Sequence, residues 1–177
     1  MTEKLLDEVW YDELPDLQEI YDQATIYART VGHIDWEFPM PEYILEDYWE
    51  KGEMYCVRGS ALGINPVFPE DPVAAVRLGT EPNPQIWQDG VKALYLGKMA
   101  AGDWARKLSV ATRIIIPGAH AVAAQRGLDE VRLDCLADNE RLRKFYQRNF
   151  IERGEVEITN KSGSKLRLTR FASKVTL

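Results

Sequence analysis

The feature that most constrains the fold of this chain is a long helix-forming segment between two short apolar segments. The apolar segments are Ala93–Ala100 (ALYLGKMA) and Val131–Cys135, and the helical pattern covers about Val110–Arg126. A connection of this length is typical of a crossover between parallel strands, whereas antiparallel strands are joined by short hairpins. The sequence therefore predicts a parallel strand pair linked by a helix, with a kink near Pro117.

The remaining predicted elements flank this unit on both sides. Before it we expect a strand, two helices and two strands, at Leu5–Trp10, Asp12–Gly32, Pro41–Lys51, Met54–Val57 and Pro72–Leu78. After it we expect a short helix and two strands, at Asn139–Arg148, Ile151–Ile158 and Lys165–Phe171. The early strands are joined by loops too short for crossovers and should be antiparallel. The predicted fold class is α/β (α+β), a mixed, twisted sheet of six or seven strands with helices on both faces, in one domain over residues 1–177.

Composition narrows the class of protein further. The 177 residues carry a net charge of −6, which argues against binding a nucleic-acid backbone. The two cysteines, Cys56 and Cys135, form no metal-ligand pair with the histidines, His33 and His120, and we interpret them as reduced. No apolar run approaches the roughly 20 residues that cross a bilayer. The acidic N-terminal segment lacks the apolar stretch of a signal peptide. We therefore expect a cytoplasmic protein.

A candidate anion site lies where the long helix is predicted to begin, at Arg106-Lys107-Leu108-Ser109-Val110-Ala111. A helix N-terminus presents about four unpaired backbone N–H groups and the positive end of the helix dipole. Small side chains allow an anion to approach the backbone, and nearby basic residues, including Arg113, add positive charge. The segment therefore suits a pyrophosphate. The alternative interpretation is that Ser109 only caps the helix and that the basic side chains are solvated.

These residues, with those that follow, resemble the GNAT superfamily of acyl-CoA N-acyltransferases, whose acyl-CoA loop reads Arg/Gln-x-x-Gly-x-Gly/Ala. Arg106 and Ala111 match this pattern, and Ser109 replaces its first glycine. Further matches are the small residues of the helix, the strand that follows it and the next helical segment, at Ala119, Ala123, Gly127, Arg132–Cys135, Asn139, Leu142, Phe145 and Tyr146. Asn149-Phe150 stands where the family has Gly-Phe, and asparagine tolerates the left-handed conformation that ends a helix.

The resemblance implies a GNAT-like fold with a splayed parallel strand pair, and an N-acetyltransferase that transfers an acetyl group from acetyl-CoA by direct attack of a primary amine. Backbone N–H groups of Met99 or Ala100 would polarise the thioester carbonyl. The cofactor-binding turn would comprise Arg106, Lys107, Leu108, Ser109, Val110, Ala111 and Thr112. Asn139 would contact the pantetheine, unless it is only an N-cap. Tyr146 would protonate the departing thiolate, unless it is only a core aromatic.

The residues leave the general base and the acceptor open. The segment ALYLGKMA contains no acid, so Asp89, Glu81, Asp35 or a water remain alternatives, and Asp134 and His120 are interpreted as structural. Four aromatic residues either line the amine site or belong to the core: Trp36, Phe38, Trp49 and Trp87. The expected acceptor is a small-molecule or peptide amine, with no metal, nucleic acid or membrane involved and a homodimer as one assembly to test. The alternative function is a CoA-binding sensor of the same fold that does not turn over.

Overall fold

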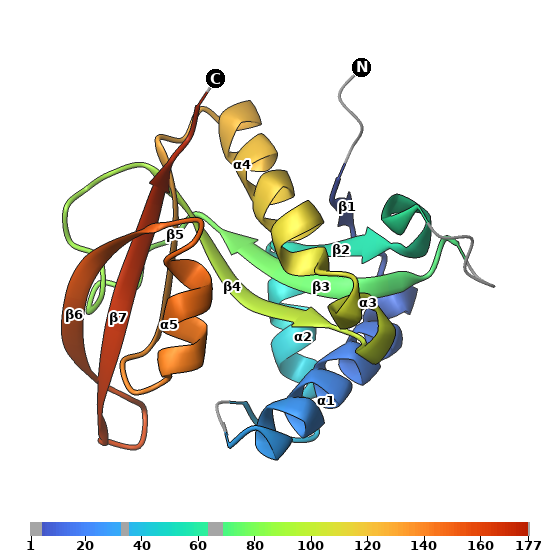
Figure 1. The fold of residues 1–177 in the computed structure, drawn as a ribbon, viewed down its shortest axis with the longest axis horizontal. Coiled ribbons are helices and arrows are strands. Elements are labelled where there is room, and N and C mark those ends of the chain that lie inside the picture. The colour runs from blue at the N-terminus through green and yellow to red at the C-terminus, as the bar shows by residue number, and fades with distance from the viewer. Residues whose placement is uncertain (1–4, 33–35, 64–68, 177) are drawn as a thin grey trace. The chain divides into compact units, whose positions relative to one another are not determined.

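The computed structural model describes residues 5–32, 36–63 and 69–176, and no helix in these ranges is long and apolar enough to cross a membrane. Within them the strands form one seven-stranded sheet of order β1-β2-β3-β4-β5-β7-β6 (Figure 1). The strands are β1 (Asp7–Glu8), β2 (Met54–Arg58), β3 (Pro72–Gly79), β4 (Ala93–Ala101), β5 (Glu130–Leu136), β6 (Ile151–Thr159) and β7 (Lys165–Lys174). This arrangement confirms the predicted mixed sheet.

The four predicted helices are present in the predicted order, as α1 (Leu14–Thr30), α2 (Glu42–Glu50), α4 (Ile116–Gln125) and α5 (Glu140–Tyr146). Helix α3 (Asp103–Lys107) is an additional short helix that the sequence did not indicate. One-turn segments are the 3₁₀ turns η1 (Tyr11–Glu13) and η2 (Gly59–Leu62) and the π-helical turn η3 (Ala111–Ile115). The first strand is shorter than the predicted Leu5–Trp10, because the chain already turns at Trp10, whose N–H donates to Glu13 Oε2 at 2.8 Å.

The chain divides into two compact units. Unit 1 comprises Met1–Leu78 and Lys98–Ala119, and unit 2 comprises Gly79–Gly97 and His120–Leu177. Strand β4 and helix α4 therefore each contribute residues to both units. Each unit is described by itself below.

Unit 1 is built on β2 and β3, which pair antiparallel, as β1 and β2 also do. Residues Met54–Val57 and Val73–Val76 are buried without alternation, which shows that both faces of these strands are covered. One core cluster joins α1 and α2 to these strands through Val9, Leu14, Leu17, Ile20, Tyr21, Met40, Leu45, Met54, Cys56, Ala75 and Ala100. The apolar spacing that predicted the two helices is therefore the spacing of this core face.

Unit 2 contains the parallel pair that the crossover predicted. Ala93–Tyr95 of β4 pairs in parallel with Glu130–Arg132 of β5, and β5 pairs antiparallel with β7. The β4–β5 pairing ends there, although Leu96 and Gly97 of β4 and Leu133–Leu136 of β5 continue both strands. This matches a pair that separates toward its carboxyl ends. Figure 1 shows β6 and β7 as a long hairpin beyond β5.

Both faces of the β5–β7 sheet in unit 2 are covered. On one face Tyr146 of α5 packs against Phe171, with ring centroids 5.7 Å apart. On the other face the loop between β3 and β4 packs Ile86 and Trp87 against Leu168 and Ala172 of β7. Residues 80–92 of this unit therefore act as the cover of one sheet face.

The structure specifies one local prediction and corrects another. The irregularity expected near Pro117 takes the form of the π-helical turn η3 directly before it, in which Ile116 N–H donates to Ala111 C=O. Proline lacks the N–H for an i−4 bond and its ring crowds that carbonyl, so the turn before it widens. Asn149 does not adopt a left-handed conformation. Its N–H donates to Tyr146 C=O at 3.0 Å, and the chain enters β6 directly.

Candidate functional site

Strand β4 has a conformational irregularity directly before Met99 and Ala100. Lys98 has φ 48°, a left-handed conformation that is uncommon for a side-chain-bearing residue within a strand. Its carbonyl accepts a hydrogen bond of 2.7 Å from the hydroxyl of Tyr21, which is fully buried. A local break of this kind re-aims the backbone groups that follow it. The role of the Met99 and Ala100 N–H groups stays a prediction. The left-handed Lys98 is the feature of unit 1 that affects the direction of these groups.

The predicted phosphate turn has a different local structure from the one expected. Arg106 and Lys107 do not open the long helix but form the last turn of the separate helix α3. Ser109 ends that segment with φ 57°, in the left-handed region. The glycine that Ser109 replaces in the family pattern adopts this conformation at no steric cost, whereas serine is strained there. Ser109 therefore has a glycine-like backbone, and its side chain is exposed.

The helix N-terminus that follows Ser109 is formed as the sequence predicts. Arg113 N–H donates to Ser109 C=O at 3.0 Å, which is the first i−4 hydrogen bond of this helical segment. The backbone N–H groups of Val110, Ala111 and Thr112 precede that bond and have no acceptor within the helix. Such groups, with the helix dipole, form a site for a phosphate oxygen.

The basic side chains near this turn are arranged unequally. Arg106 bonds Asp103 Oδ1 at 2.9 Å and lies 3.7 Å from the ring centroid of Tyr27. Its Nη1 is buried and has no hydrogen-bond partner among the described residues. Lys107 and Arg113 are exposed, although Arg113 also reaches the carbonyl of Leu108. Arg106 thus has a donor to spare, while part of its charge is already balanced by Asp103.

In unit 2, Asn139 and Tyr146 occupy the start and the end of α5. Asn139 Oδ1 accepts a hydrogen bond of 3.0 Å from Leu142 N–H, so the N-cap interpretation of Asn139 is confirmed. Its amide nitrogen is the part that remains for a ligand. Tyr146 is buried against the rings of Phe145, Phe150 and Phe171.

The packing of Tyr146 also determines its ionisation. Burial raises the pKa of Tyr146 well above its usual value, and the charges of Cys135 and Asp134 raise it further. The phenol therefore stays protonated at neutral pH and keeps its proton available for a basic leaving group. Tyr146 is both a core aromatic and a retained proton donor, so its catalytic role stays a prediction.

Asp134 of β5 combines accessibility with a perturbed pKa. Its side chain retains exposed surface. The surrounding protein nevertheless desolvates the carboxyl group and raises its pKa from 3.8 to about 6. An accessible carboxyl group with this pKa is suited to accept a proton near neutral pH. Sequence reasoning treated Asp134 as structural, because a strand residue shows nothing of its tertiary surroundings.

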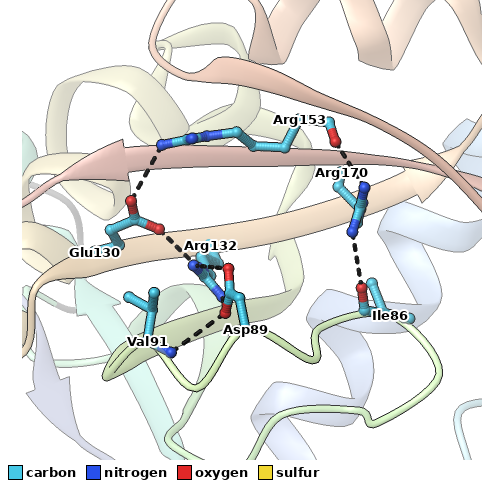
Figure 2. Close-up of polar contacts among 7 residues, drawn as sticks. All are labelled: Ile86, Asp89, Val91, Glu130, Arg132, Arg153 and Arg170. Carbon is cyan, nitrogen blue, oxygen red and sulfur yellow. Dashed lines mark hydrogen bonds and ion pairs between the residues drawn. The ribbon is translucent and has the colours of Figure 1, made fainter.

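The base candidates taken from the sequence are less suited to this role. Asp89 forms a two-bond ion pair with Arg132, both bonds 2.8 Å, and this hydrogen bonding lowers the pKa of Asp89 to about 2 (Figure 2). Such a carboxylate is a weak base at neutral pH. Glu81 is exposed in the loop after β3, and Asp35 lies outside the described residues.

The four aromatic residues proposed for the acceptor site separate into different environments. Trp36 packs edge-on against Tyr21 and lies 5.3 Å from the ammonium of Lys98. Trp49 donates to Val9 C=O and joins the core of unit 1, while Phe38 is 44% exposed. In unit 2, Trp87 is buried beneath Arg132. Trp49 and Trp87 are therefore core residues, and Trp36 and Phe38 retain surface for a ligand.

Comparison with known proteins places the fold. No protein-family model matches the sequence, and no curated protein matches it. Among solved structures, a GNAT-family acetyltransferase from Listeria monocytogenes superposes with TM-score 0.73 at 17% identity, over 96% of this chain and 93% of that one. An N-acetyltransferase from Staphylococcus aureus gives 0.65 at 15% identity, over 97% and 98%. Arabidopsis thaliana NAA60 in complex with acetyl-CoA gives 0.63 at 14% identity, over 96% and 98%. The chain therefore has the GNAT acyltransferase fold.

Proposed function

We propose that this protein is an acetyl-CoA-dependent N-acetyltransferase that acetylates a primary amine of a small molecule or peptide. The observation that carries the proposal is the left-handed Ser109 directly before a helix N-terminus, in a chain with the GNAT fold. Its backbone has a left-handed conformation that glycine adopts without strain, and the family pattern has glycine at this position. The N–H groups after it are available to a phosphate. The solved structure of Arabidopsis NAA60 with acetyl-CoA, which has the same fold, supports acetyl-CoA as the co-substrate.

The proposed reaction is direct transfer. The acceptor nitrogen forms a bond to the thioester carbonyl carbon as the carbon–sulfur bond breaks, and N–H groups of Met99 or Ala100 stabilise the negative charge on the carbonyl oxygen. Asp134 takes the proton from the acceptor amine, since its pKa of about 6 leaves it ionised yet basic at neutral pH. Tyr146 supplies a proton to the departing thiolate. The fourth strand needs no acid of its own in this scheme, because β5 provides the base.

The test has a binding step and a turnover step. Calorimetry should show that acetyl-CoA binds the intact protein, and that a bulky Ser109→Trp substitution abolishes binding by blocking the phosphates. A thiol-release assay with a panel of primary amines and short peptides then measures turnover. Unchanged acetyl-CoA affinity in the Ser109→Trp variant would place the cofactor elsewhere. Binding without thiol release on any amine would favour the sensor function instead.

A further inference from the structure

The strand register of unit 2 places an arginine directly opposite Asp134. In the antiparallel β5–β7 pair, Asp134 faces Arg170, one position from the Leu133–Phe171 pair of the opposite face. Residues so paired have Cβ atoms about 4.5–5.5 Å apart on the same side of the sheet, and opposite charges there attract. The register of the two strands would therefore favour an Asp134–Arg170 ion pair.

The guanidinium of Arg170 is instead bonded to two backbone carbonyls. Nη2 donates to Arg153 C=O at 2.8 Å and Nη1 donates to Ile86 C=O at 3.3 Å, as Figure 2 shows. Arg170 also lies 5.5 Å from the ring centroid of Trp87, and its Nε is buried with no hydrogen-bond partner among the described residues. Both acceptors come from outside β7, so they direct the guanidinium toward β6 and the loop before β4.

Irregular backbone makes these carbonyls available. The pairing of β6 with β7 shifts register between Glu152 and Glu155, and Gly154 has φ 80°. A bulge of this kind leaves one residue out of the strand ladder, which frees the Arg153 carbonyl for a side-chain donor. Ile86 lies in the loop that covers this face, outside the strands, so its carbonyl is not used in strand pairing. The fork of an arginine suits two such acceptors at once.

The other charged groups of this face are also paired with partners other than Asp134. Arg132 is bonded to Asp89 and to Glu130 Oε2, and Arg153 is bonded to Glu130 Oε1 (Figure 2). The elements around Asp134 carry the following titratable groups: Arg132 on β5, Arg170 on β7, Tyr95 on β4, Tyr146 on α5, Arg153 on β6 and Asp89 in the covering loop. Burial, and not the charge of any of these groups, raises the pKa of Asp134. None of the described cations forms an ion pair with Asp134, and every arginine among them has another acceptor.

We propose that Arg170 is a positioning residue, held by the carbonyls of Ile86 and Arg153 so that Asp134, its cross-strand partner, remains an unpaired carboxylate able to take the acceptor's proton. The catalytic role of the Asp134 carboxylate in this inference rests on the proposed function. The absence of an Arg170–Asp134 ion pair is a property of unit 2 that can be measured without turnover. The free carboxylate is the one that a protonated acceptor amine would meet.

The test is a carboxyl-carbon NMR titration of the full chain, with the Asp134 resonance assigned by its loss in Asp134→Asn. In Arg170→Lys the cation is kept but the fork is lost, so the ammonium is freed to pair with Asp134 and the pKa of Asp134 should fall by about 1 or more. In Arg170→Met the cation is removed and the pKa should stay or rise. Arg167→Lys, on the same strand but exposed and paired with Glu155, is the matched control and should change nothing.

The pH profile of kcat/KM separates this inference from the proposed function. If both hold, the acid limb moves to lower pH in Arg170→Lys by as much as the NMR pKa does. If the NMR pKa falls while the acid limb stays in place, Arg170 is confirmed as withheld and Asp134 is removed from the reaction. An unchanged Asp134 pKa in a folded Arg170→Lys variant, or a fall in Arg170→Met, overturns the inference. If Arg170 only stabilises the fold, Arg170→Lys and Arg170→Met should both lower the melting temperature and leave the pKa of Asp134 unchanged.

Discussion

Asp134→Asn is the sharpest test of the proposal that Asp134 is the general base, because it should reduce activity and raise stability together. The folded protein raises the pKa of Asp134 from 3.8 to about 6. The folded state therefore holds its proton more tightly than the unfolded chain, and ionising the group above that pKa weakens the fold. The cost is absent below about pH 4, grows between pH 4 and 6, and is fully present above.

The size of the gain follows from the same shift. A rise of about two pKa units corresponds to about 3 kcal/mol of unfolding free energy, because each pKa unit is worth roughly 1.4 kcal/mol. Asp134 retains exposed surface, so solvent screening reduces this, and we expect about 1 kcal/mol. For a chain of this length that raises the melting temperature by about 2–4 °C at pH 8, and by only about a third as much at pH 4.5, where about a third of the ionisation cost is present. Asparagine keeps the size of the side chain, so packing should not differ.

The assay is thermal unfolding at both pH values beside the pH profile of kcat/KM, with the exposed Asp138→Asn as control. Loss of a general base should lower kcat/KM by about 10²–10⁴-fold and remove the acid limb near pH 6. A stability gain that is equal at pH 4.5 and pH 8 would refute the desolvation argument. Full activity in the Asp134→Asn variant would refute the proposed base, whatever its stability.

Four further predictions concern the cofactor turn and Tyr146. Ser109→Gly should stabilise the protein by about 1 kcal/mol in a denaturant titration, because glycine adopts φ 57° without strain, and Ser109→Pro should unfold the turn and abolish acetyl-CoA binding in calorimetry. Arg106→Ala should weaken acetyl-CoA binding only modestly, since backbone N–H groups supply most contacts and Asp103 already balances part of the Arg106 charge; loss of all binding would contradict this. Tyr146→Phe should keep the melting temperature and acetyl-CoA affinity but lower the turnover rate by about 10–10³-fold, whereas an unchanged rate would leave Tyr146 a packing residue.

The order of the elements and the parallel crossover could be predicted from the sequence, because periodicity and loop length are local properties. The apolar segments of β4 and β5, with a helical pattern between them, were sufficient to predict that these strands pair in parallel. The sequence also indicated a turn at Ser109 before a helix, and the structure forms that turn there. The left-handed φ of Ser109 then agreed with the glycine of the pattern.

The proposed choice of Asp134 over Asp89 as the base depends on tertiary contacts. Asp89 forms an ion pair with Arg132. Asp134 lies opposite Arg170 in the sheet, but the guanidinium of Arg170 is hydrogen-bonded to the backbone carbonyls of Ile86 and Arg153 instead. These partners come from β5, β6, β7 and the covering loop, so their distances depend on strand register and on the bulge at Gly154. The pKa of a carboxyl group depends on burial and neighbouring charge, and both are set by segments that only folding brings together.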